Sequence, residues 1–70
     1  MTLKKRSFSL SGHRTSVALE AEFWAVLEAE TARSKLSMAA LFAQIDGKRG
    51  PRPLASALRL HALAAASRAP

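Results

Sequence analysis

The spacing of the apolar residues changes at about residue 20. Before this point, Thr15, Val17 and Leu19 alternate with polar or small residues, which is the pattern of a strand with one buried face. After it, apolar residues recur at helical spacing, starting with Phe23. The sequence therefore predicts a short strand that leads directly into a helix over residues 20–33.

A turn over residues 34–37 and a second helix follow. Ser37 is a suitable N-cap, because its hydroxyl can accept a hydrogen bond from a free backbone N–H of the first turn. The apolar stripe of this helix has the spacing i, i+3, i+4 and i+7 and consists of Met38, Leu41, Phe42 and Ile45. Two Gly and two Pro residues within residues 47–53 then predict a loop.

A third helix is predicted over residues 54–66, and it is apolar on two sides. Its two stripes are Leu54, Ala57, Leu58 and His61 on one side, and Leu60, Leu63 and Ala64 on the other. Arg59 lies between them. This pattern indicates a helix that is buried between two protein surfaces.

The first eleven residues allow two interpretations. The basic residues near the start favour a mobile arm. Phe8 and Leu10, however, alternate with serines, which predicts a short extra strand over residues 7–11. Gly12 and His13 would then either turn a hairpin or bend a continuous strand.

The small core predicted for this chain favours an oligomer. Of 70 residues, 15 are Ala and 19 are large apolar residues, so a monomer would barely offset its ordering entropy. There is no Cys for a disulfide framework, and two distant His do not make a structural zinc site. A single strand also lacks a partner for its backbone groups. We therefore expect the partner strand to come from a second copy of the chain.

Charge is distributed unevenly along the sequence. Residues 1–16 carry +4, residues 17–46 carry −3 and residues 47–70 carry +5. Segregated positive charge indicates a polyanionic partner, most often nucleic acid. No secretory signal and no apolar run of membrane-spanning length is visible, so we expect a cytoplasmic protein without membrane contact.

The order strand, helix, capped turn and helix resembles the ribbon-helix-helix family of small bacterial DNA-binding proteins. The resemblance covers about residues 6–64, and a subgroup with a third helix is the most similar. The residues that carry it are Arg14, Thr15, Ser16, Val17, Ala18 and Leu19, then Phe23 and Leu27, then Leu36 and Ser37, and the segment 52–63.

This resemblance implies a mostly α-helical ribbon-helix-helix fold with one short β-strand. Two chains would form an intertwined homodimer, whose two-stranded antiparallel ribbon lies in the DNA major groove, with a C-terminal third helix added. The expected divisions are a basic N-terminal arm (1–11), the ribbon-helix-helix core (12–46), a Gly/Pro loop (47–53), the third helix (54–66) and a frayed tail (67–70).

The resemblance also implies a role for each candidate site residue. The base-contact candidates are Arg14, Ser16 and Ala18. The phosphate-contact candidates are Lys4, Lys5, Arg6, Ser37 and Met38. The dimer core is expected to contain Thr15, Val17, Leu19, Phe23, Leu27, Leu41, Phe42 and Ile45.

The expected function is transcriptional regulation by a homodimer, or a tetramer, on double-stranded DNA, with a protein partner such as a toxin as a further possibility. The alternative is a protein-interaction or assembly module on the same fold, because Ala18 stands where a polar base reader is usual and the third helix is doubly apolar. No spacing joins a nucleophile to His13 or His61, so we expect no enzyme, no cofactor and no metal site.

Overall fold

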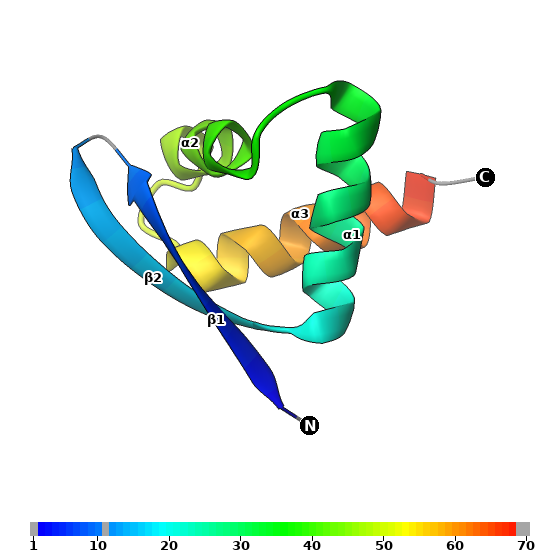
Figure 1. Ribbon diagram of the computed structural model, residues 1–70, viewed down its shortest axis with the longest axis horizontal. Helices are drawn as coiled ribbons and strands as arrows, with labels where there is room; N and C mark the ends of the chain where they lie inside the picture. Colours follow the sequence, from blue (N-terminus) through cyan, green and yellow to red (C-terminus); the bar gives the residue numbers. More distant parts are fainter. Residues whose placement is uncertain (1, 11, 69–70) are drawn as a thin grey trace.

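The computed structural model describes residues 2–10 and 12–68, apart from the side chain of Arg68. Over these residues the chain forms an antiparallel β-hairpin followed by three helices (Figure 1). The elements are β1 Leu3–Leu10, β2 His13–Glu20, α1 Ala21–Ser34, α2 Met38–Lys48 and α3 Leu54–Arg68. The predicted two-stranded ribbon followed by three helices is confirmed.

The partner of the predicted strand lies in the same chain. β1 pairs with β2 from Leu3 opposite Glu20 to Leu10 opposite His13. The expectation of one strand that needs a second copy is therefore wrong, and so is the mobile arm for residues 3–6. Gly12 has φ +79°, a left-handed conformation that suits a glycine in the short turn of a hairpin. Met1 and Ser11 lie outside the described residues.

The basic start of the chain can form a strand because the long side chain of Arg6 packs on the protein. The Arg6 guanidinium lies 4.6 Å from the ring centroid of Trp24, which is a cation–π contact. The pattern of Phe8 and Leu10 therefore continues through Arg6 on the same face of β1. Sequence reasoning that treated Lys4 to Arg6 only as charges could not detect this continuation.

The helix boundaries follow local signals. Lys35, after α1, has φ 58°, and the backbone N–H of Leu36 donates to the carbonyl of Thr31 at 3.1 Å. The Ser37 hydroxyl accepts from the N–H of Ala40 at 3.0 Å, as expected for an N-cap. α3 runs through Arg68, so the frayed tail predicted from residue 67 is wrong for residues 67–68, and residues 69–70 lie outside the described part.

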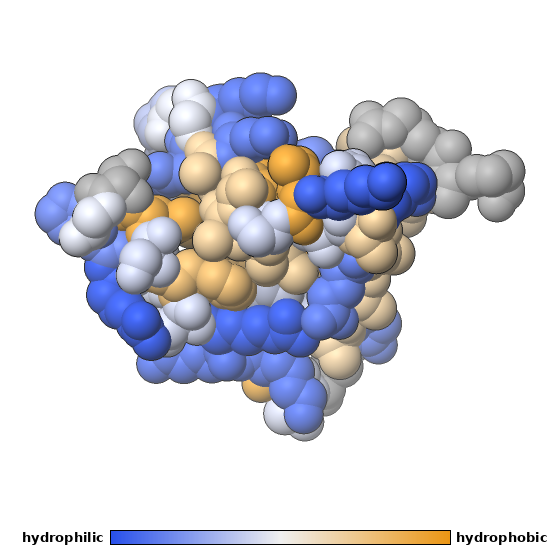
Figure 2. All heavy atoms as spheres, turned by 45° about the horizontal axis from the view of Figure 1, so that its top comes forward, coloured by the Kyte–Doolittle hydropathy of each residue, from blue (hydrophilic) through white to orange (hydrophobic). Residues whose placement is uncertain are grey.

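The core forms within one chain. β1 packs on α2, while β2 packs on α3 and α1. Apolar side chains gather in the middle of the face shown in Figure 2, with hydrophilic residues around them. Six residues expected in a dimer core are buried in this single-chain core, namely Val17, Leu19, Leu27, Leu41, Phe42 and Ile45. Thr15 and Phe23, also expected there, are half-buried.

An aromatic cluster joins the hairpin to the helices. The Phe42 ring lies 4.5 Å from that of Phe8 and stacks on Trp24 at 5.8 Å between centroids. Trp24 is 2% exposed, and its indole N–H donates to the Lys4 carbonyl at 2.8 Å. Within α1, Trp24 and Leu27 are buried, whereas Phe23, where the predicted apolar pattern of this helix starts, lies at the edge of the core.

Candidate nucleic-acid interface

The hairpin presents one polar face away from the helices. Residues directly opposite each other in an antiparallel pair share a face of the sheet. Arg14 lies opposite Ser9, and Ser16 lies opposite Ser7. These four residues are exposed, whereas Val17, one position after Ser16, is 5% exposed and points into the core. The alternation predicted for this strand therefore separates a buried face from an exposed one.

The three base-contact candidates lie together on this exposed face. Arg14, Ser16 and Ala18 occupy alternate positions of β2, and Ala18 lies opposite Lys5. The hydroxyls of Ser7 and Ser16 are 2.9 Å apart and form a hydrogen bond across the strands. We refer to the surface formed by these residues and Ser9 as the ribbon face: Lys5, Ser7, Ser9, Arg14, Ser16 and Ala18.

Sequence reasoning missed two members of the ribbon face, Ser7 and Ser9. Their signal was the alternation of serine with Phe8 and Leu10, which already predicts serines on the face opposite the apolar residues. They could not be assigned because the sequence left open whether this segment pairs with the following strand. Once the two strands pair, Ser7 lies opposite Ser16 and Ser9 lies opposite Arg14.

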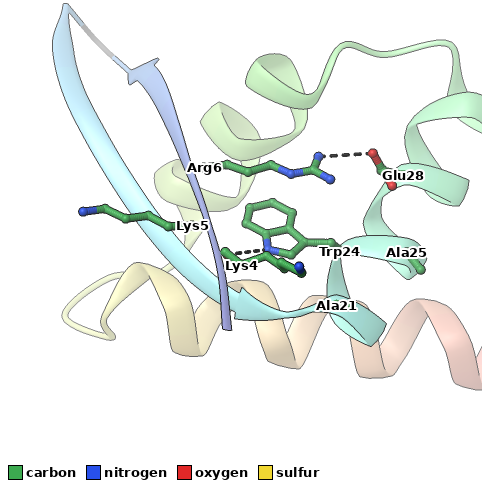
Figure 3. A pocket seen from close by; sticks show the side chains of 7 residues that line it. All are labelled: Lys4, Lys5, Arg6, Ala21, Trp24, Ala25 and Glu28. Carbon is green, nitrogen blue, oxygen red and sulfur yellow. Dashed lines mark hydrogen bonds and ion pairs between the residues drawn. The ribbon is translucent and has the colours of Figure 1, made fainter. Parts of the chain in front are cut away.

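The three basic residues of β1 do not act as one group. Figure 3 shows Arg6 reaching over Trp24 toward α1, while Lys5 extends away from it. Arg6 Nη1 lies 3.1 Å from Glu28 Oε2, so its charge is partly compensated. A shallow pocket of about 420 Å³ lies here, and Lys4 also lines it. Of the three, Lys5 alone shares the face of Arg14.

Ser37 and Met38 lie at the N-terminus of α2, not on the hairpin. The first turn of a helix leaves backbone N–H groups without helical acceptors, and these groups can bind anions. The Ser37 hydroxyl already satisfies the N–H of Ala40. Any anion at this end would therefore be held by the other backbone N–H groups of the turn.

Glu20 is the one acidic residue of the two strands, and its charge is compensated. Arg59 Nε on α3 lies 3.0 Å from Glu20 Oε1. The carboxylate's hydrogen bond with its own backbone, followed by the bond from Arg59, lowers the pKa of Glu20 below its usual value. The carboxylate is thus ionised at neutral pH but paired, so it adds little net negative charge near the ribbon face.

Two features are absent from the part of the chain that the structure describes, and a side-chain hydrogen bond there links two helices. Residues 2–10 and 12–68 contain no cluster of three or more His, Asp or Glu side chains placed to hold a metal ion. No helix among them has the length and apolar character needed to cross a membrane. His61 Nε2 lies 2.7 Å from Glu30 Oε1, where the ring links α3 to α1.

Comparison of the sequence with known proteins and protein families identifies its fold family. No curated protein and no solved structure is significantly similar to it. The family model described as a ribbon-helix-helix domain matches residues 3–66, which include both strands and nearly all of the three helices. The chain belongs to the ribbon-helix-helix domain family.

Proposed function

We propose that this protein is a transcriptional regulator that binds double-stranded DNA with the ribbon face in the major groove. Proteins of the family are generally DNA-binding transcriptional regulators. The major groove, about 12 Å wide, admits a two-stranded ribbon. The observation that carries the proposal is the exposed polar surface of a two-stranded hairpin whose other surface is covered by helices.

The residues of the ribbon face would have different roles. Arg14 can contact O6 and N7 of a guanine through its planar fork, which makes it the main base reader. Ser16 can donate to or accept from a base edge, and Ala18 can contact a thymine methyl group. Lys5 is exposed and would neutralise a backbone phosphate.

Phosphate contacts at α2 would fix the orientation of the protein on the duplex. The free backbone N–H groups at Ser37 and Met38 suit a phosphate, because they carry the positive end of the helix dipole. Lys4 is exposed and adds positive charge at the start of β1. Such contacts position the protein but carry no sequence information.

Two copies would act on one operator, each with its own hairpin. Three base-facing positions in β2 read few base pairs, so a second half-site is needed for specificity. Pairing of two hairpins edge to edge would give four strands spanning roughly 15 Å between outer backbones, which exceeds the width of the groove. We therefore place the two hairpins in successive turns of the groove.

The direct test is the Arg14→Ala variant. Loss of a bidentate guanine contact should weaken binding to the preferred site by about 1–3 kcal/mol, roughly 5- to 150-fold, and leave weak binding to random DNA nearly unchanged. Fluorescence anisotropy with an operator selected from a random library would measure both affinities. Arg33→Ala, an exposed arginine in the last turn of α1, is the control. Equal, weak binding of wild type and Arg14→Ala to every duplex would contradict base reading by the ribbon face.

A second candidate function is protein interaction or assembly on the same fold. The specific observation is that Leu60 and Leu63 on α3 are 47% and 55% exposed, although the sequence predicted that this stripe is covered. If the protein is an interaction module, salt would abolish all DNA binding, and selection from a random DNA library would yield no preferred operator.

A further inference from the structure

A groove with an apolar floor and a basic rim lies between the end of α2 and the start of α3. It is an open groove of about 260 Å³, and Ile45, Ala57 and Leu60 form its apolar floor beside His61. An apolar cavity of ~150 Å³ is enough to hold a benzene molecule, so this groove has room for a large apolar side chain. We call it the α2–α3 groove.

The rim of the α2–α3 groove is positively charged. Lys48, Arg49 and Arg52 line it. Arg49 Nε lies 2.6 Å from Asp46 Oδ1, and its Nη1 donates to the Arg52 carbonyl at 2.7 Å, so Arg49 holds the loop in place. Lys48 and Arg52 are exposed, and no ion pair to either occurs within residues 2–10 and 12–68.

An exposed apolar ridge continues from the floor. Leu60 lines the groove and is 47% exposed, and Leu63, one helical turn further along α3, is 55% exposed. Ala64 beside them is exposed as well. Apolar side chains one turn apart match the spacing with which an amphipathic helix presents its own anchors.

The groove faces away from the hairpin. Arg59 of α3 reaches Glu20 at the end of β2. Residues two positions apart on a helix differ by ~200° around the axis, so Ala57 and His61 point to the opposite side of α3 from Arg59. DNA held by the ribbon face would therefore leave the groove free, whereas Leu63, four residues after Arg59, lies nearer the side of α3 that faces Glu20.

We propose that the α2–α3 groove is a docking site for an acidic amphipathic helix of a partner protein. Its leucines would cover Leu60, Leu63 and the groove floor, while its carboxylates would pair with Lys48 and Arg52. Charge complementarity selects this occupant, because the exposed Lys48 and Arg52 on the rim attract carboxylates. The proposal does not depend on DNA binding.

The test uses a defined probe rather than an unknown partner. A fluorescein-labelled synthetic peptide of roughly 16 residues, about four helical turns, would carry leucines on one face and glutamates on the other. We expect it to bind the full chain, with amide chemical-shift changes concentrated at Lys48, Arg52, Leu60 and Leu63. The same peptide with lysines in place of glutamates should bind at least about tenfold more weakly.

Matched variants separate the groove from general charge. The Lys48→Glu/Arg52→Glu variant should weaken peptide binding at least about tenfold, whereas Arg33→Glu/Lys35→Glu, with the same change in net charge, should stay within about twofold of wild type. Leu60→Ser should also weaken binding, and Leu3→Ser, 50% exposed on β1, should not. Circular dichroism checks the fold of each variant, and Leu60→Ser remains informative if the charge-reversed chain unfolds.

Four results would overturn the proposal. The first is equal affinity of the charge-reversed and control variants. The second is a set of shift changes on the ribbon face instead of the groove. The third is self-association in sedimentation velocity that Leu60→Ser abolishes, which would assign the groove to a second copy. The fourth is displacement of the peptide by a short DNA duplex that shifts Lys48 and Arg52, which would assign the rim to nucleic acid.

Discussion

At the residue scale, Glu20 joins three elements. It is the last residue of β2, it precedes the first residue of α1, and its carboxylate pairs with Arg59 on α3. Sequence reasoning placed Glu20 at the start of the helix predicted over residues 20–33. A pairing between residues 39 positions apart cannot be inferred from such local reasoning.

We expect Glu20 to contribute to the pH dependence of stability. Its pKa in the folded chain lies below the ordinary value of 4.5, so the unfolded chain binds its proton more readily. Its contribution is therefore fully present above about pH 4.5 and is lost as the pH falls through the folded-state pKa. Urea unfolding from pH 7 to pH 3 should show a smaller acid-induced loss of stability for Glu20→Gln than for wild type. Identical pH profiles of the two proteins would show that the pair contributes nothing.

At the scale of the elements, the attachment of β1 depends on Trp24. The indole is buried, stacks on Phe42, lies beneath Arg6 and donates to the Lys4 carbonyl. A two-stranded hairpin is marginal alone in water, so β1 needs these contacts with the helices. The ribbon face therefore depends on a residue that does not belong to it.

The Trp24→Phe variant tests this attachment. It removes the hydrogen bond to Lys4, which contributes about 1 kcal/mol, and leaves part of the indole volume empty, so unfolding should be easier by roughly 1–3 kcal/mol. Amide hydrogen exchange should accelerate most in β1. Phe23→Leu, at a half-buried neighbouring position, should cost less and leave β1 protected. Unchanged exchange in β1 of Trp24→Phe would mean that the pairing with β2 alone holds the strand.

At the scale of the whole molecule, the single-chain hairpin changes what a second copy has to provide. The ribbon and the core are complete in one chain, so a partner is not needed to complete the sheet. The uneven charge stays relevant, because a net charge of +6 favours a polyanionic partner.

We expect two copies to bind one operator together. Sedimentation velocity of the complex should show two chains on a duplex whose half-sites are centred about 10 bp apart, on one face of the helix. Shifting one half-site by about 5 bp, half a helical turn, should abolish any cooperativity between the copies. Spacing-independent binding would contradict this assembly.

The sequence determined the features that rest on local patterns. The alternation through Val17 and Leu19, the cap at Ser37 and the loop before Leu54 are each set by neighbouring residues, and the elements they predicted are present. The two faces of β2 were assigned correctly as well. Successive side chains of a strand point to opposite faces, so burial of Val17 and Leu19 places Ser16 and Ala18 on the other face.

Only the tertiary structure decided which parts of the chain meet. It paired β1 with β2 within one chain, buried Trp24 more deeply than Phe23, added Ser7 and Ser9 to the ribbon face, and left Leu60 and Leu63 exposed. The spacing of apolar residues predicts which face of an element is buried, but it does not predict which other part of the protein covers that face. The partner depends on contacts between distant residues, whose free energies are comparable for several arrangements until the whole chain has packed.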